Sequence, residues 1–278
     1  VSAFPVPMTA TSLEAEVGRV LGSERRSSRE ARERLSHLLL VPITTRLRAV
    51  TQLLWVPDEA LGTLGIDLLP LADGQALGDT IQVLTFPSLE HAEELRGRGV
   101  QSAKGIRGLA SNRLEEELES ASGRGLHFRL PCRVGRGGGA EILLELPGSP
   151  GGEEGQTALE DSVGADGILS PPEILRLDSS GTLVILPVCG SGSASPVGRS
   201  VLLQDQAFID GGAAALIRQT WTVPEAASKR FDEVLEAELS GGADIPTAFA
   251  AARAGVRKRW KRSKVWAAWR LTTAPLSP

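Results

Sequence analysis

Short apolar runs alternate with longer segments of helical periodicity along almost the whole chain. Apolar runs that end at turn signals predict strands at residues 52–58, 80–86, 126–130, 142–146, 183–188, 214–221 and 266–271. Apolar residues three or four positions apart predict helices at residues 13–21, 28–40, 111–120, 170–175, 205–215, 224–239 and 248–260. This alternation is typical of βαβ units, so we expect an α/β fold with a mainly parallel central sheet and helices on both faces.

The alternation continues without a linker from end to end, and we therefore expect a single domain over residues 1–278. One segment departs from the pattern, because residues 147–165 are rich in Gly, Glu and Ser. That composition predicts an exposed, flexible loop, which proteases should cut first. The chain begins with Val1 rather than Met, which leads us to expect the C-terminal part of a larger protein.

Composition excludes several classes of protein. With 41% hydrophobic and 23% charged residues, the chain has enough apolar material for a core. No apolar stretch approaches about 18 residues and the N-terminus lacks a signal pattern, so we expect no membrane segment. The two cysteines provide no disulfide framework, which favours a reducing compartment and a cytoplasmic location.

The net charge of −4 argues against nucleic acid as the main partner. One segment is nevertheless strongly basic around Trp260, and its cations are Arg253, Arg257, Lys258, Arg259, Lys261, Arg262 and Lys264. These cations could contact phosphates, which leaves a nucleic-acid effector as a third and weaker class of function. A solvated helix end is the favoured interpretation.

Metal and hydrolase motifs fail when their spacing is tested. The histidines His37, His91 and His127 are far apart, and the two cysteines share no ligand spacing. Ser191 lacks the first glycine of a G-x-S-x-G elbow, because Cys189 stands there. We therefore expect neither a metal nor a cofactor.

Cys189 is the side chain that the pattern presents as a reactive group. The apolar run Leu183–Val188 predicts a buried strand, and Cys189 follows it directly, before the sequence Gly-Ser-Gly. A thiol at the carboxyl end of a central strand lies where open α/β sheets bind their ligands. The alternative is that Cys189 is a small buried hydrophobic residue. The strand alone leaves both interpretations open.

Several segments carry a resemblance to one family when they are taken in order. They are residues 38–42 (LLLVP), 54–61 (LWVPDEAL), 85–89 (TFPSL), 166–175 (DGILSPPEIL), 183–192 (LVILPVCGSG), 207–223 (AFIDGGAAALIRQTWTV) and 266–269 (WAAW). Their order and spacing between Arg32 and Leu271 resemble the CHAT family. Members of this family are caspase-like domains usually found beside tetratricopeptide repeats.

The resemblance implies a caspase–hemoglobinase-like three-layer sandwich with a mainly parallel central sheet. In that fold the strand that carries the catalytic base lies next to the strand that carries the nucleophile. Strand 126–130 is therefore expected beside strand 183–188. The tendency of consecutive strands joined by a crossover to be neighbours supports the same expectation.

The resemblance also implies a Cys–His cysteine peptidase, a hydrolase, in which Cys189 matches the family's nucleophile. The base is normally the second histidine of the family's L-H-x-x-x-H-G motif. This chain keeps the first histidine as His127 but has Pro131 at the position of the base. Cys132 replaces the following glycine, whose backbone N–H helps to bind the oxyanion.

These two departures matter because a free thiol, with a pKa of about 8.5, is only a few per cent thiolate at neutral pH. Proline can neither activate the thiol nor protonate a leaving amine, and general acid–base catalysis contributes roughly 10²–10⁴-fold. His127 is a poor substitute, because four residues along a strand span about 13 Å. We interpret His127 as a structural histidine and Cys132 as a small residue that fills the vacated space.

We therefore expect a pseudoenzyme that acts as a protein-binding or regulatory module, with a protein or peptide partner and a neighbouring tetratricopeptide or sensor domain. The alternative is an active cysteine endopeptidase that takes its base from elsewhere, for example from a loop around Arg133–Gly139. On either interpretation a groove lies at the carboxyl ends of the central strands, with Asp166, Gly190 and Trp221 as its substrate-binding residues. Asp166 has a second interpretation as a turn residue before Gly167.

Overall fold

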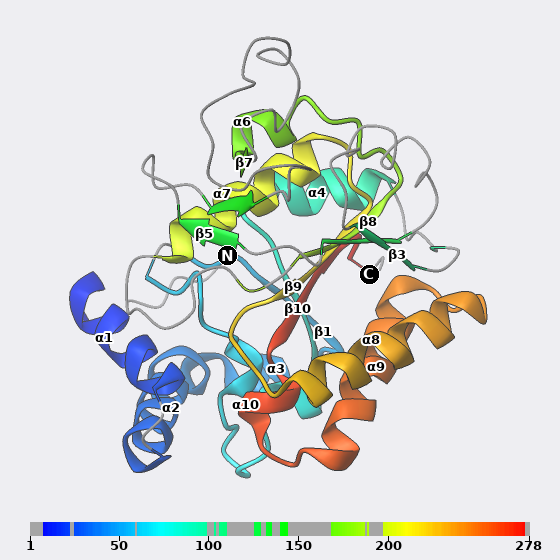
Figure 1. The fold of residues 1–278 in the computed structure, drawn as a ribbon. Coiled ribbons are helices and arrows are strands. Elements are labelled where there is room, and N and C mark those ends of the chain that lie inside the picture. The colour runs from blue at the N-terminus through cyan, green and yellow to red at the C-terminus, as the bar shows by residue number, and fades with distance from the viewer. Residues whose placement is uncertain are drawn as a thin grey trace.

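The structure is a computed structural model that describes residues 8–22, 25–58, 60–98, 103, 106–109, 125–128, 132–134, 140–143, 168–186, 188 and 197–275. A seven-stranded sheet runs through the centre of these residues (Figure 1). From one edge to the other its strands are β1 (Gln52–Trp55), β2 (Gln82–Thr85), β10 (Trp269–Thr273), β9 (Ala215–Gln219), β8 (Leu183–Leu186), β4 (Gly125–Phe128) and β3 (Ile106–Leu109). A smaller antiparallel sheet contains β5 (Cys132–Val134), β6 (Ala140–Leu143) and β7 (Ile168–Leu169).

The described part of the large sheet is mainly parallel, as expected. Five of its six neighbouring pairs are parallel, and only β9 and β10 pair antiparallel. Because of that junction, β1, β2 and β10 run opposite to the other four strands. The carboxyl ends of β8 and β9 thus lie at the same edge of the sheet as the amino ends of β2 and β10. We call this edge the β8 carboxyl edge.

Helices cover both faces of the sheet. The described α-helices are α1 (Ala10–Leu21), α2 (Arg25–Leu39), α3 (Thr44–Leu47), α4 (Leu89–Arg98), α6 (Pro171–Ile174), α7 (Val197–Asp210), α8 (Glu225–Ser240), α9 (Ile245–Arg259) and α10 (Ser263–Trp266). Short 3-10 helices occur at η1 (Val41–Ile43), η2 (Ile66–Leu68) and η3 (Leu77–Asp79). Figure 1 shows α4 and α7 on one side of the sheet, with α8 and α9 on the other.

Two consecutive residues of β10 confirm this layering. The ring of Trp269 stacks on Phe231 of α8, with centroids 4.3 Å apart and planes inclined by 3°. The next side chain, Arg270, reaches Asp205 of α7 on the opposite face, at 2.9 Å. Successive strand side chains point to opposite faces, so β10 contributes to both layers. The α/β architecture with helices on both faces is therefore present.

The start of the predicted helix at Ser170 is confirmed. The carboxylate of Glu173 accepts a hydrogen bond from the Ser170 N–H at 2.9 Å, which forms the capping box of α6. The prediction for the first two helices and for the strands at 52–58, 80–86 and 183–188 also agrees with α1, α2, β1, β2 and β8, apart from their ends.

Two predicted boundaries are wrong. The helix predicted at 205–215 is α7, which begins at Val197 and ends at Asp210. It stops there because Gly212 takes a φ of 99°, a left-handed conformation that reverses the chain towards β9. The last strand, predicted from residue 266, begins only at Trp269, because Ser263–Trp266 form α10. The helix predicted at 111–120 and the loop predicted at 147–165 lie outside the described residues.

Candidate functional site

The strand predicted to carry the base and the strand predicted to carry the nucleophile are neighbours, as expected. β4 and β8 pair in parallel, with Leu126 opposite Val184 and His127 opposite Ile185. All four side chains of β8 are buried, which is typical of a central parallel strand covered on both faces. Position 131 stands four residues after His127, and position 189 stands four residues after Ile185.

The other predicted catalytic and binding residues are described only in part. Cys189, Gly190, Pro131 and Asp166 lie outside the described residues. The backbone of Cys132 belongs to β5, opposite Ile142 of β6. The segment Arg133–Gly139, from which an alternative base could come, is described only at its first two residues, which complete β5.

Trp221 is the predicted binding residue whose side chain the structure describes. It follows β9 at the β8 carboxyl edge, and its indole Nε1–H donates to the carbonyl oxygen of Lys264 at 2.6 Å. Its ring lies against Gly65, where a Cβ atom would be only 2.9 Å from the indole. Trp221 therefore fixes the end of β9 to α10, and only its ring surface is left for contact with a partner.

A buried cluster of charged residues joins α7 to the central strands. The carboxylate of Asp205 contacts Arg218 Nε at 2.6 Å and Arg270 Nη2 at 2.9 Å. The three side chains are 3%, 2% and 7% exposed, respectively. Arg218 also donates to Gln204 Oε1 at 2.6 Å, and Arg270 to the carbonyl oxygen of Gly62 at 2.7 Å.

The strand register explains why the two arginines meet. Arg218 of β9 lies directly opposite Arg270 of β10, and it also pairs with Leu186 of β8. One carboxylate thus lies between two guanidinium groups in the core. Burial lowers the pKa of Arg270, and the attraction of Asp205 opposes that shift. The cluster fixes α7, the helix that follows the Cys189 segment along the chain, to the strands at the β8 carboxyl edge.

Sequence analysis does not find this cluster, although a signal is present. Arg218 interrupts the apolar run Ala213–Ile217, and a charged residue inside a buried strand requires a buried partner. The partner cannot be chosen from the sequence, because Asp205 is one of several acidic residues on predicted helices.

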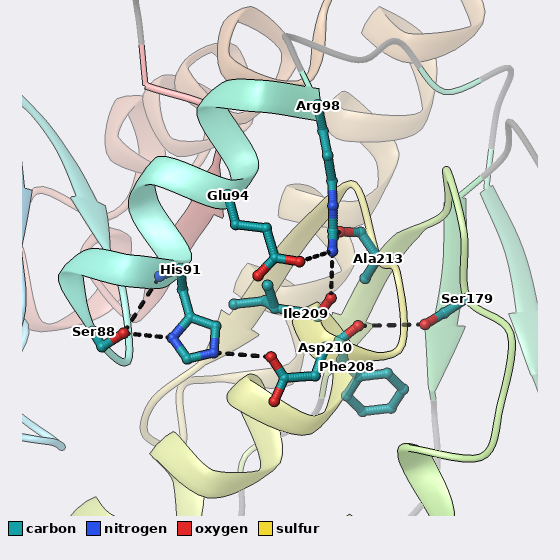
Figure 2. A network of polar contacts seen from close by, with 9 residues as sticks. All are labelled: Ser88, His91, Glu94, Arg98, Ser179, Phe208, Ile209, Asp210 and Ala213. Carbon is teal, nitrogen blue, oxygen red and sulfur yellow. Dashed lines mark hydrogen bonds and ion pairs between the residues drawn. The ribbon is translucent and has the colours of Figure 1, made fainter.

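A second polar network attaches α7 to α4 (Figure 2). Ser88 Oγ lies 2.7 Å from His91 Nδ1, and His91 Nε2 lies 3.1 Å from Asp210 Oδ1. The His91 N–H also donates to Ser88 Oγ at 3.3 Å, so Ser88 caps the start of α4. An imidazole protonated at Nε2 satisfies both ring contacts.

Figure 2 also shows how the same network closes the C-terminal end of α7. Arg98 donates to the carbonyl oxygens of Ile209 and Ala213, at 2.9 and 2.7 Å. Ser179 Oγ donates to the carbonyl oxygen of Phe208 at 3.4 Å, the contact drawn in Figure 2, and to that of Gly211 at 2.9 Å. Ile209 lies in the last turn of α7, and Gly211 and Ala213 follow it, so these contacts hold the end of the helix and the turn into β9, which is a structural role.

His91 lies away from the carboxyl end of β8, the strand that precedes Cys189 in the chain. It lies beyond the carboxyl end of β2 and contacts the C-terminal end of α7, at the edge opposite the β8 carboxyl edge. β10 and β9 separate β2 from β8, which corresponds to about 14 Å at the usual strand spacing. Both of its ring nitrogens are also occupied by Ser88 and Asp210.

Several cations of the basic segment have partners within the protein. Arg253 contacts the buried carboxylate of Asp67 at 2.5 Å, and Arg257 contacts Asp79 at 2.8 Å. Burial raises the pKa of Asp67, a shift that the attraction of Arg253 only partly offsets. Arg253 therefore packs into the fold, whereas Arg257, Lys258 and Arg259 at the end of α9 are exposed, in agreement with a solvated helix end.

The described residues contain no cluster of candidate metal ligands and no helix that could span a membrane. No group of three His, Cys, Asp or Glu side chains comes together within the described ranges. Among the helices that the structure describes, none is long and apolar enough to cross a membrane. Comparison with protein-family models finds no match, and comparison with curated proteins finds none.

Proposed function

We propose that the chain is a degenerate CHAT domain, a caspase-like domain that binds a protein or peptide partner without cleaving it. The observation that carries the proposal is the register of β4 against β8. The backbones of His127 and Ile185 are register partners, and the positions that match the family's base and nucleophile, 131 and 189, each follow four residues later. This equal offset is what a base and a nucleophile on neighbouring parallel strands require.

The layered architecture supports the caspase–hemoglobinase-like part of the proposal. A mainly parallel sheet has α4 and α7 on one face and α8 and α9 on the other, which is the layer order of a three-layer sandwich (Figure 1). The buried Asp205 cluster holds α7 against β9 and β10 at the edge where Cys189 would act.

The loss of cleavage follows from the chemistry at position 131. A proline side chain has no group that can accept or donate a proton, and His91 lies at the other edge of the sheet. The partner surface that we propose is the β8 carboxyl edge, with Asp166, Gly190 and the ring of Trp221 as contacts. A tetratricopeptide or sensor domain in a longer cytoplasmic protein would supply the neighbouring module.

The test compares the chain with two variants on a library of fluorogenic peptides. Cys189→Ala removes the thiol, and the double variant Pro131→His/Cys132→Gly restores the family's His-Gly pair. We expect equal background with the unchanged chain and with Cys189→Ala. We expect the double variant to cleave peptides, and to lose this activity when Cys189→Ala is added.

Two results would contradict the proposal. Cleavage by the unchanged chain that Cys189→Ala abolishes would show an active cysteine endopeptidase with a base from elsewhere. A correctly folded double variant without any activity would count against the match of positions 131 and 189 to the family's catalytic pair.

A further inference from the structure

A cavity of about 590 Å³ lies between α2, the segment 68–79 and the connection from α9 to α10. Its polar lining residues are Arg29, Arg32, Glu33, Ser36, His37, Asp79, Arg257, Lys261 and Ser263. Trp266 and the segment 68–79 place it towards the β8 carboxyl edge, beside the amino ends of β10 and β2. Its volume is within the range of about 300–1,000 Å³ that is usual for small-molecule sites.

The charges around the cavity have the opposite sign to the chain as a whole. Four cationic side chains and two carboxylates line it, which gives a formal charge of +2 with His37 neutral. The complete chain carries −4. Cations therefore gather at this cavity against the overall acidic balance, and the local field favours a negatively charged ligand.

Two of these cations have no carboxylate partner among the described residues. Glu33 lies 3.7 Å from Arg29, and Asp79 lies 2.8 Å from Arg257. Both carboxylates are thus already paired, and within the described residues neither Arg32 nor Lys261 forms an ion pair, although the charge of Glu33 attracts Arg32.

Arg32 is the more informative of the two, because it is half-buried. Its Nη1 donates to Ser263 Oγ at 2.8 Å and its Nε to the carbonyl oxygen of Ser28 at 3.4 Å. Both acceptors are neutral. Burial lowers the pKa of Arg32, and burial together with the nearby Arg32 charge lowers the pKa of Lys264. An anion beside Arg32 would relieve the cost of both buried charges.

Part of the cavity lining is apolar. Its accessible apolar residues are Val41, Pro70 and Leu71, and Val41 is 49% exposed, whereas Leu68 and Trp266 are only 1% and 3% exposed. A cavity with an apolar wall and a few cations fits a ligand that has a hydrophobic body and an anionic group. Guanidinium groups bind phosphate oxygens with particular strength, because their N–H donors match the geometry of the anion.

We propose that this cavity binds a phosphorylated small molecule with a flat apolar body, of the nucleoside phosphate class. The phosphate groups lie between Arg32 and Lys261, and the apolar body lies along the wall formed by Val41, Pro70 and Leu71. The cavity lining includes none of the residues named in the proposed CHAT function, so the two proposals do not depend on each other.

Isothermal titration calorimetry with four probes tests the proposal on the full chain. ADP carries both parts of the expected ligand, pyrophosphate carries only the anion, adenosine carries only the apolar body, and inorganic phosphate is the smallest anion. We expect ADP to bind at one site per chain, more tightly than each of the other three. Raised salt should weaken ADP binding, because the attraction is largely electrostatic.

Matched variants locate the binding. Lys261→Gln changes an exposed residue of the cavity, and Lys258→Gln changes an exposed lysine three residues earlier in the chain that does not line it. We expect Lys261→Gln and Arg32→Gln each to weaken ADP binding about tenfold, the loss expected for one hydrogen bond to a charged group. Lys258→Gln should bind as the unchanged chain does.

Three results would overturn the proposal. They are an absence of saturable ADP binding, equal losses in Lys261→Gln and Lys258→Gln, and binding of pyrophosphate or adenosine as tight as that of ADP. Urea midpoints of the variants show whether each is folded, and because Lys261 is exposed, its variant tests the site even if Arg32→Gln is destabilised.

Discussion

The substitution Asp205→Asn should strongly destabilise the fold. The carboxylate of Asp205 lies between two buried guanidinium groups, at 2.6 Å from Arg218 and 2.9 Å from Arg270. Asparagine keeps the shape of the side chain but removes its negative charge, which leaves two buried positive charges side by side. The loss of one partner from a buried ionic cluster costs about 3–5 kcal/mol, a large part of the roughly 5–15 kcal/mol that stabilises most domains.

Urea unfolding followed by circular dichroism measures this cost, as a lower midpoint with an unchanged m-value. Asp73→Asn is the matched control, because Asp73 is exposed and either side chain can accept the hydrogen bond from the Gln75 N–H. We expect that control to change the free energy of unfolding by less than about 0.5 kcal/mol. Adding Arg270→Met to Asp205→Asn should cost less than the sum of the two single changes, because the repulsion is then removed. A loss below about 1 kcal/mol for Asp205→Asn would refute the reasoning.

Three further predictions follow from separate parts of the chain. Gly212→Ala should lower the free energy of unfolding by more than about 1 kcal/mol, because φ of Gly212 is 99° and the new Cβ would lie 2.6 Å from Ser180 Oγ. Gly242→Ala is the control in the same urea assay, and it should cost less because Gly242 has a similar φ of 89° but open space around the new Cβ. Hydrogen bonds from the Ser180 side chain and N–H lower the pKa of Asp178. The contribution of Asp178 to stability is therefore present above the unfolded-state pKa and is lost as the pH falls through the folded-state pKa. In a carbon-detected NMR titration, Ser180→Ala should raise the pKa of Asp178, and no change would contradict the assignment. Iodoacetamide labelling of Cys189 against pH should give an apparent pKa near that of a free thiol, about 8.5, and a value well below it would refute the loss of the catalytic base.

Sequence analysis predicted the fold class because each element satisfies a local rule. The apolar run of β8, the capping box at Ser170 and the periodicity of α8 are visible within a few residues. It predicted β4 beside β8 as well, because both the resemblance and the crossover rule pointed to that pair. It missed α4, whose buried face consists of only His91, Ala92 and Leu95 in a mostly charged stretch.

The sequence by itself therefore determined the alternation of strands and helices, the apolar strand that leads to Cys189 and the proline at the position of the base. Only the tertiary structure decided that β1, β2 and β10 run opposite to the other strands of the large sheet. It also decided that Asp205 pairs with arginines 13 and 65 residues away, and that Arg32 and Lys261 line the same cavity. The physical reason is the range of the forces: helix caps and hydrophobic periodicity act over one or two turns of chain, whereas the pairing of buried charges depends on which distant segments the core brings into contact.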